Sequence, residues 1–128
     1  MVEGGIRAPR LLIVESDRHS FDELRAAFAE ESLECEVALD LETALSILDE
    51  RRMDLAVVNA QLAEEEEEEL IEKLHAKCPD MRLVLYEGTA ERARRRRLRR
   101  MGADSYLTTA SDLAAVARAA VRVLEENA

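Results

Sequence analysis

The sequence predicts an α/β protein built on a doubly wound parallel sheet. Two short, uninterrupted apolar runs, Leu11–Val14 and Leu55–Val58, are typical of strands that are buried on both faces. Between and after them, strand-like segments alternate with segments whose apolar residues recur at helical spacing. We therefore expect five strands and five helices, with the strand order 2-1-3-4-5.

Composition and charge narrow the class of protein. With 128 residues, 48% of them hydrophobic and 36% charged, the chain fits one globular domain. No apolar run is long enough to span a bilayer, and Met1–Gly5 lacks the features of a signal peptide, so we expect a cytoplasmic protein with no membrane partner. Cys35 and Cys78 lack metal-ligand spacing, and we expect both to be reduced, partly buried thiols.

The first strand follows a short lead-in. Residues 1–9 are expected to be flexible and to precede a single domain over residues 10–126. A helix should begin just after the strand Leu11–Val14, near Asp17, and end near Glu31. Its apolar residues recur at helical spacing, which gives it one face for the core.

The next elements are a weaker strand, a helix and the middle strand. Cys35–Leu39 shows some alternation of polar and apolar residues, which favours a position near the edge of the sheet. Asp40 follows it and suits the N-cap of a second helix. The third strand, Leu55–Val58, leads through a loop to a helix over residues 64–77, which ends before Pro79.

The last third of the chain completes the alternation. Leu83–Tyr86 is the fourth strand, residues 89–101 the fourth helix, and Asp104–Leu107 the fifth strand. Ser111 should cap a final helix, which is apolar on more than its core-facing side and so offers a modest patch for a homodimer. The residues of this second stripe are Ala114, Ala115, Ala119 and Val123.

Polar side chains follow the strands of this predicted sheet. The loops after the first and third strands face each other at the carboxyl edge, where open α/β folds place their chemistry. The residues expected around this cleft are Glu15, Ser16, Asp17, Asn59, Glu87 and Thr109. At the end of the middle strand the side chain is an amide, not a carboxylate.

Four segments of the chain resemble the receiver domain of bacterial two-component response regulators. They are Leu11–Asp17, Asp54–Asn59, Leu83–Gly88 and Gly102–Thr109, in the family's order and at its intervals, within residues 10 to about 125. The resemblance implies a five-stranded receiver fold. It also implies a magnesium ion on two acidic residues, a phosphorylated aspartate after the third strand, a threonine or serine after the fourth, and a lysine after the fifth.

Nearly all of these functional positions are changed in this chain. The acidic magnesium pair falls on Glu15 and Ser16, and the phosphorylated aspartate falls on Asn59. The threonine or serine falls on Glu87, and the lysine falls on Thr109. One carboxylate of the magnesium pair is therefore missing, unless Asp17 substitutes for it. The position of the family's switch aromatic is retained as Tyr106.

The substitutions predict a site without phosphoryl chemistry. An acyl phosphate needs a carboxylate oxygen as nucleophile, and the amide of Asn59 is a far poorer one. Magnesium prefers oxygen ligands, largely carboxylates, so we expect magnesium binding to be weak or absent, and no cofactor. An alternative is that Glu15, Asp17 and Glu87 share a cation or a proton, because close carboxylates raise one another's affinity for positive charge.

Two runs of charge stand out in a chain with a net charge of −10. Glu64–Glu69 is an unbroken acidic block, and residues 92–100 contain seven arginines. One interpretation is a contact between the third and fourth helices; the other is a surface for an acidic partner. The residues of this candidate interface are Arg92, Arg95, Arg96, Arg99 and Arg100. Nucleic acid is disfavoured by the acidic net charge and by the lack of interleaved aromatic residues.

These observations lead to one main hypothesis and two alternatives. We expect a degenerate, or pseudo-receiver, domain without enzymatic activity, acting as a phosphorylation-independent adaptor for another signalling protein. In the family, the surface of the fourth helix, fifth strand and fifth helix commonly carries such contacts. The first alternative is a sensor that binds a small ligand or cation in the altered acidic pocket. The second is a response regulator phosphorylated at an unusual site.

Overall fold

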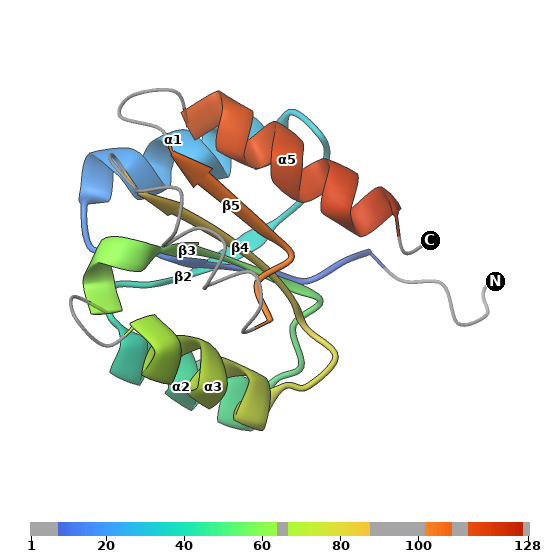
Figure 1. Cartoon of the computed structure of the whole chain (residues 1–128). Coiled ribbons are helices and arrows are strands. Elements are labelled where there is room, and N and C mark those ends of the chain that lie inside the picture. The colour runs from blue at the N-terminus through green and yellow to red at the C-terminus, as the bar shows by residue number, and fades with distance from the viewer. Residues whose placement is uncertain (1–7, 64–66, 88–101, 109–112, 127–128) are drawn as a thin grey trace, which may run out of the picture.

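The part of the chain that the structure describes folds into three layers, with a parallel sheet between two pairs of helices (Figure 1). The computed structural model describes residues 8–63, 67–87, 102–108 and 113–126. The predicted fourth helix over residues 89–101, the lead-in over residues 1–7 and the capping residue Ser111 lie outside these ranges.

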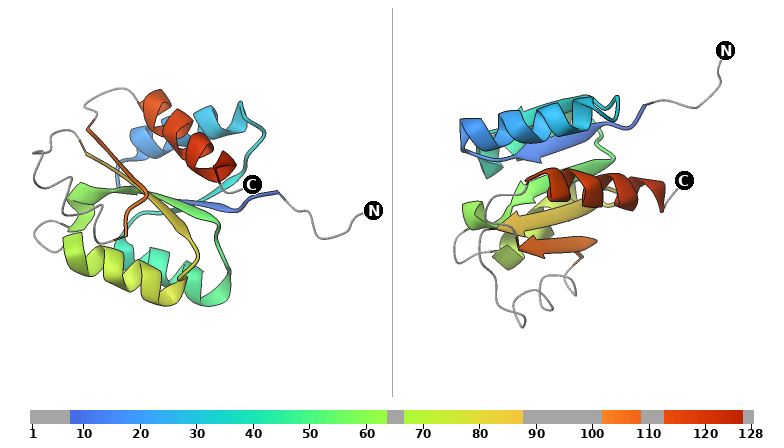
Figure 2. Two further views of the ribbon diagram at one scale, coloured as in Figure 1. Left: turned by 45° about the vertical axis from the view of Figure 1, so that its right-hand side comes forward. Right: turned by 90° about the horizontal axis from the view of Figure 1, so that it is seen from above.

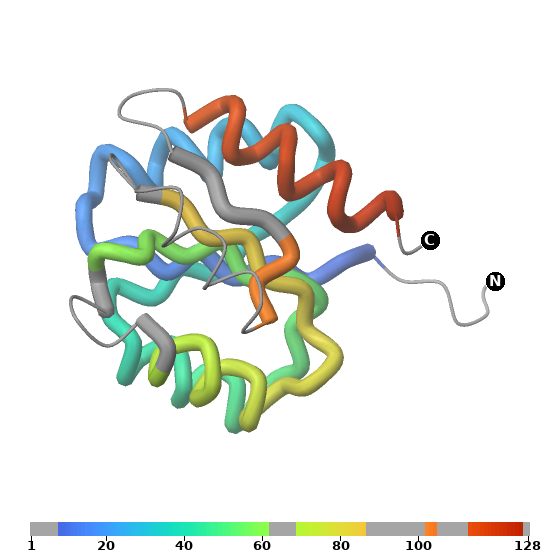
Figure 3. The backbone as a smooth tube through the Cα atoms, in the orientation of Figure 1, coloured from blue at the N-terminus to red at the C-terminus, as the bar shows by residue number. Residues whose placement is uncertain are grey.

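The sheet has the predicted parallel arrangement. Its strands, in spatial order, are β2 (Cys35–Ala38), β1 (Leu11–Val14), β3 (Leu55–Asn59), β4 (Arg82–Glu87) and β5 (Ser105–Thr108). The strand order 2-1-3-4-5 is therefore confirmed, and β1 and β3 run through the middle of the fold (Figure 3).

The helices follow the predicted alternation, with shifted ends. They are α1 (Arg18–Ala29), α2 (Leu41–Glu50), the short 3-10 helix η1 (Ala60–Ala63), α3 (Glu67–Lys77) and α5 (Leu113–Glu125). Asp40 caps α2 as predicted, because its carboxylate accepts a hydrogen bond of 2.7 Å from the backbone N–H of Thr43. Among the described helices, none has the length and apolar character needed to cross a membrane.

Two hydrophobic cores lie on the two faces of the sheet. Alternate residues of β1 point to opposite faces: Leu12 and Val14 pack toward α2 and α3, whereas Leu11 and Ile13 pack toward α1 and α5. Figure 2 shows the two helical layers on either side of the sheet. This burial on both faces explains why the strands carry continuous apolar runs.

The two cysteines are free thiols, as predicted. Cys78 is buried and Cys35 is half-buried. Desolvation raises the pKa of the Cys35 thiol to about 11, so it stays protonated at neutral pH.

The predicted second apolar stripe of the last helix needs correction. Ala119 and Val123 are only 4% and 6% exposed, so they are covered within the monomer. Ala115 is half-buried and Ala114 is exposed. Because α5 packs against both the sheet and α1, its buried surface is wider than a single stripe.

Candidate functional site

A buried carboxylate lies at the carboxyl edge of the sheet, directly after β1. Glu15 carries a charged side chain that is only 2% exposed. Its backbone N–H donates a hydrogen bond of 3.0 Å to the carbonyl of Ala38, which holds it against β2. Removing a carboxylate from water is costly unless hydrogen bonds compensate, so its partners decide what it can do.

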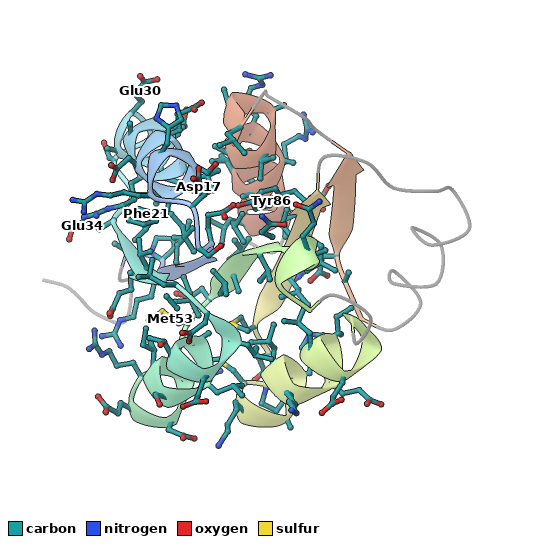
Figure 4. All side chains as sticks on the ribbon, turned by 90° about the vertical axis from the view of Figure 1, so that its left-hand side faces the viewer. Asp17, Phe21, Glu30, Glu34, Met53 and Tyr86 are labelled. Atoms are coloured by element: carbon teal, nitrogen blue, oxygen red, sulfur yellow. The ribbon has the colours of Figure 1, made fainter. Side chains whose placement is uncertain are left out.

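Three donors converge on the Glu15 carboxylate. The Asn59 amide Nδ2 lies 3.1 Å from Oε1 and 3.3 Å from Oε2. The Tyr86 hydroxyl donates to Oε1, and the backbone N–H of Asp17 donates to Oε2 at 3.0 Å. We call these four residues the Glu15 network; Figure 4 looks onto this end of the sheet, with Asp17 and Tyr86 labelled. All of its partners are donors, which suits an ionised carboxylate.

The strand register brings these side chains together. Val14 is paired with Val58 across β1 and β3, so the residues that follow them, Glu15 and Asn59, leave the two strands at the same level. Asn59 is in turn paired with Tyr86 across β3 and β4. Neighbouring strands are about 4.8 Å apart, which places the side chains at these three strand ends within hydrogen-bonding reach.

Tyr86 is a site residue that sequence reasoning missed. In the sequence, Tyr86 stands only at the end of the predicted fourth strand, although a buried tyrosine usually has a hydrogen-bond partner for its hydroxyl. It is 4% exposed and packs in the core shared with α1 and α5. Burial raises its pKa most, and the hydrogen bond to Glu15 and the charges of Glu15 and Asp17 raise it further, so the phenol remains a donor at physiological pH.

Both ends of the Asn59 amide are engaged. While Nδ2 donates to Glu15, Oδ1 accepts a hydrogen bond of 3.0 Å from the backbone N–H of Gln61 at the start of η1. An ionised aspartate could accept from Gln61 but could not donate to Glu15. The amide therefore fits this position in a way that a carboxylate does not.

Asp17 takes part through its backbone, while its side chain caps α1. The carboxylate accepts hydrogen bonds from the backbone N–H of Ser20 at 2.9 Å and from its hydroxyl at 2.7 Å. These bonds hold the pKa of Asp17 below its usual value. The adjacent Ser16 is exposed. Within the described part of the chain, no three His, Cys, Asp or Glu side chains are grouped to hold a metal ion.

Of the remaining predicted site residues, the structure describes only the backbones of Glu87 and Tyr106. Glu87 is the last residue of β4, and its backbone is paired with Thr108. The backbone of Tyr106 is paired with Leu85. The side chains of Glu87 and Tyr106, together with Thr109 and the arginines of residues 92–100, lie outside the described part of the structure.

Comparison with known proteins identifies the family. The sequence model of the response regulator receiver domain matches residues 11–121 of this chain. The chain belongs to this receiver family. A search of curated proteins gave no match.

Solved receiver structures have the same fold. A CheY-like receiver domain protein from Methanospirillum hungatei JF-1 is 25% identical, with a TM-score of 0.78 over 94% of each chain. A response regulator from Thermotoga maritima is 18% identical, with a TM-score of 0.83 over 93% of this chain and 99% of that one.

A third similar structure contains a phosphorylated site. It is a response regulator from Burkholderia pseudomallei, described with a phosphorylated aspartic acid, a calcium ion and citrate. It is 22% identical to this receiver, with a TM-score of 0.73 over 94% of this chain and 73% of that one.

Proposed function

We propose that this receiver domain signals without aspartyl phosphorylation, as an adaptor that binds another protein in a two-component-type pathway. The observation that carries the proposal is the Glu15 network. The carboxylate at the carboxyl edge already accepts hydrogen bonds from Asn59 and Tyr86. A receiver that is switched by phosphate would need that edge open for a cation and a phosphoryl group.

The middle strand does not end in a nucleophile suited to phosphorylation. Receiver phosphorylation forms an acyl phosphate on a carboxylate oxygen, and the middle strand ends here in the amide of Asn59. The carboxylate that contacts this amide belongs to Glu15, which is buried and accepts hydrogen bonds from three donors. Hydrogen bonds from three donors reduce the nucleophilicity of a carboxylate, and the burial of Glu15 hinders the approach of a phosphate donor.

A magnesium ion at this edge would have to displace groups of the protein. The ion requires several oxygen ligands in near-octahedral geometry. Its entry beside Glu15 would displace the Asn59 N–H and the Tyr86 O–H, and would draw the Asp17 carboxylate away from its cap on α1. Those losses oppose binding, and they support a site with no cofactor and with weak or no magnesium affinity.

The output surface would be formed by the predicted helix over residues 89–101 together with β5 and α5. Its candidate contact residues are Arg92, Arg95, Arg96, Arg99 and Arg100. An arginine-rich surface on a chain with a net charge of −10 fits an acidic protein partner, because nucleic acid would be repelled by the rest of the chain.

The central experiment is phosphorylation. We expect no phosphoryl adduct by intact-mass spectrometry, and no change in the amide NMR spectrum, after incubation with acetyl phosphate or beryllofluoride and Mg²⁺. A receiver that carries the aspartate serves as the positive control. A labile phosphoryl group on any carboxylate near residue 59 would contradict the proposal and would favour the unusual-site alternative.

The sensor alternative rests on the buried charge of Glu15. A cation or small ligand bound there should release measurable heat in a calorimetric titration with Mg²⁺ or Ca²⁺, and Glu15→Gln should abolish it. We expect no saturable heat in either protein. Saturable binding by the wild type alone would replace the adaptor proposal with the sensor.

A further inference from the structure

A cavity of about 670 Å³ lies at the amino edge of the sheet, at the opposite end of the strands from the Glu15 network. Segments that are far apart in the sequence form it: residues 8–11 at the start of β1, residues 32–36 leading into β2, and residues 51–53 between α2 and β3. Figure 4 labels Glu34 and Met53 from two of these segments. A volume of this size is typical of sites for small molecules. We call it the amino-edge cavity.

The floor of the amino-edge cavity is apolar and uncharged. Leu11 and Met53 line it and are only 1% and 2% exposed. Cys35 also lines it, and desolvation keeps its thiol protonated, so this side chain adds no charge. An apolar group placed on this floor would be removed from water, which favours binding.

Charged side chains of both signs surround this floor. Arg51 and Glu36 are paired with each other. Arg10 and Glu34 are both exposed, and within the described part of the chain neither side chain has an ion-pair partner. One cation and one anion are therefore available to a ligand, beside an apolar surface.

We infer that the amino-edge cavity binds a small zwitterion with an apolar body, of the class of the aliphatic α-amino acids. The carboxylate of the ligand would pair with Arg10, and its ammonium group with Glu34. Its side chain would cover Leu11 and Met53.

The charge balance of the lining favours a zwitterion over a simple ion. The lining contains two arginines and two glutamates, so its charges cancel, whereas the chain as a whole carries −10. A purely anionic ligand would be repelled by the rest of the chain, and a purely cationic one would be attracted more strongly to other parts of its surface. This site is separate from the Glu15 network and does not rest on the proposed function.

The test is an NMR titration of the ¹⁵N-labelled full chain with L-leucine. We expect saturable shifts of the backbone amides of Leu11, Cys35 and Met53, and no shift at Asn59. Each of three analogues should bind at least about twofold more weakly, because each lacks one part of the ligand. They are glycine without the apolar side chain, 4-methylpentanoate without the ammonium group, and 3-methylbutylamine without the carboxylate.

Two variants assign the two ends of the ligand. Arg10→Gln should weaken the binding of L-leucine about two- to fivefold, as expected for the loss of a solvent-accessible ion pair, and should leave that of 3-methylbutylamine unchanged. Glu34→Gln should weaken L-leucine to the same extent and leave 4-methylpentanoate unchanged. The matched controls are Arg18→Gln and Glu42→Gln, at exposed positions of α1 and α2 outside the cavity, which should bind L-leucine as the wild type does.

The inference would be overturned by any of three results. L-leucine could give no saturable shift at the cavity amides. One of the analogues could bind as tightly as L-leucine, which the wild type alone is enough to show. The Arg10 and Glu34 variants could bind L-leucine no more weakly than the two control variants do.

Discussion

Asn59 and Tyr86 together determine the chemistry open to Glu15. The amide supplies a hydrogen to the carboxylate, and the phenol supplies another, so the charge of Glu15 is compensated inside the protein. A cation would otherwise be expected to perform that compensation. Two residues with ordinary side chains therefore stabilise this buried charge.

Removing the Tyr86 hydroxyl should destabilise the fold, because the buried Glu15 carboxylate loses one of its hydrogen-bond donors. We expect Tyr86→Phe to lower the free energy of unfolding by about 1–3 kcal/mol, since a buried charged acceptor loses a donor. Urea denaturation measures the change. In a Glu15→Gln background, Tyr86→Phe should lower the free energy of unfolding by a smaller amount. A double-mutant cycle that shows no coupling between the two sites would mean that this hydrogen bond is not formed.

Changing Asn59 to aspartate should make stability depend on pH and on divalent cations. Asn59→Asp places a second carboxylate about 3 Å from Glu15 and removes a donor, so we expect a loss of about 2–3 kcal/mol at pH 7. The repulsion exists only while both groups are ionised. Stability should thus recover as the pH falls and the pair takes up a proton, or when Mg²⁺ is added.

The control for this variant is Asn59→Ala. It loses the donor without adding charge, so its melting temperature should not gain from Mg²⁺. If Asn59→Asp also showed no response to Mg²⁺ or to acidification between pH 8 and pH 5, the two side chains could not be in contact.

At the scale of elements, aspartate side chains cap two of the helices. Asp17 and Asp40 cap the two helices that follow β1 and β2. Ser20 engages the Asp17 carboxylate, which the sequence had suggested as a substitute metal ligand, in the cap of α1.

The Asp40 cap gives a pH-dependent prediction. Hydrogen bonds from the backbone and side chain of Thr43 lower the pKa of Asp40 in the folded protein. The contribution of Asp40 to the stability of the fold is therefore complete above its unfolded pKa of about 3.9, and it is lost as the pH falls through the lower folded pKa. Asp40→Ala should lower the melting temperature by about 3–6 °C at pH 7, and by less at pH 3. Asp22→Ala, an exposed position within α1, is the control and should have little effect at either pH.

A side chain at residue 102, just before β5, is disfavoured by the backbone angle of Gly102 and by its neighbour His75. Its φ is +110°, and an added Cβ would lie 2.6 Å from Cε1 of His75 on α3. Gly102→Ala should therefore destabilise the fold by about 1–3 kcal/mol, measured by urea denaturation. Adding His75→Ala should restore part of this loss by removing the clash, while the backbone strain remains. A full recovery would assign the effect to the clash alone.

At the scale of the whole molecule, a net charge of −10 on a domain of this size opposes compactness. Salt should screen the repulsion, so we expect the melting temperature to rise between about 10 mM and 150 mM NaCl. MgCl₂ at the same ionic strength should raise it equally. A distinctly larger rise with MgCl₂ would show that a divalent cation binds the folded state, against the proposed function.

The sequence alone determined the fold of this protein and the placement of Glu15 and Asn59 at one edge of the sheet. Continuous apolar runs such as Leu55–Val58 predict strands buried on both faces, and the alternation of strands and helices then restricts the topology. For the same reason, the contact between Glu15 and Asn59 could be expected: both residues leave central strands at one edge of the sheet.

Only the tertiary structure decided how that edge is used. In a strand buried on both faces, the sequence pattern does not say which face a residue takes, so Tyr86 could not be assigned to Glu15 until the register of β3 and β4 was known. Likewise, Ala119 and Val123 resemble surface residues on the helix pattern but are covered within the monomer. Hydrogen bonds and burial depend on distances between segments far apart in the chain, and those distances are set by packing rather than by local sequence.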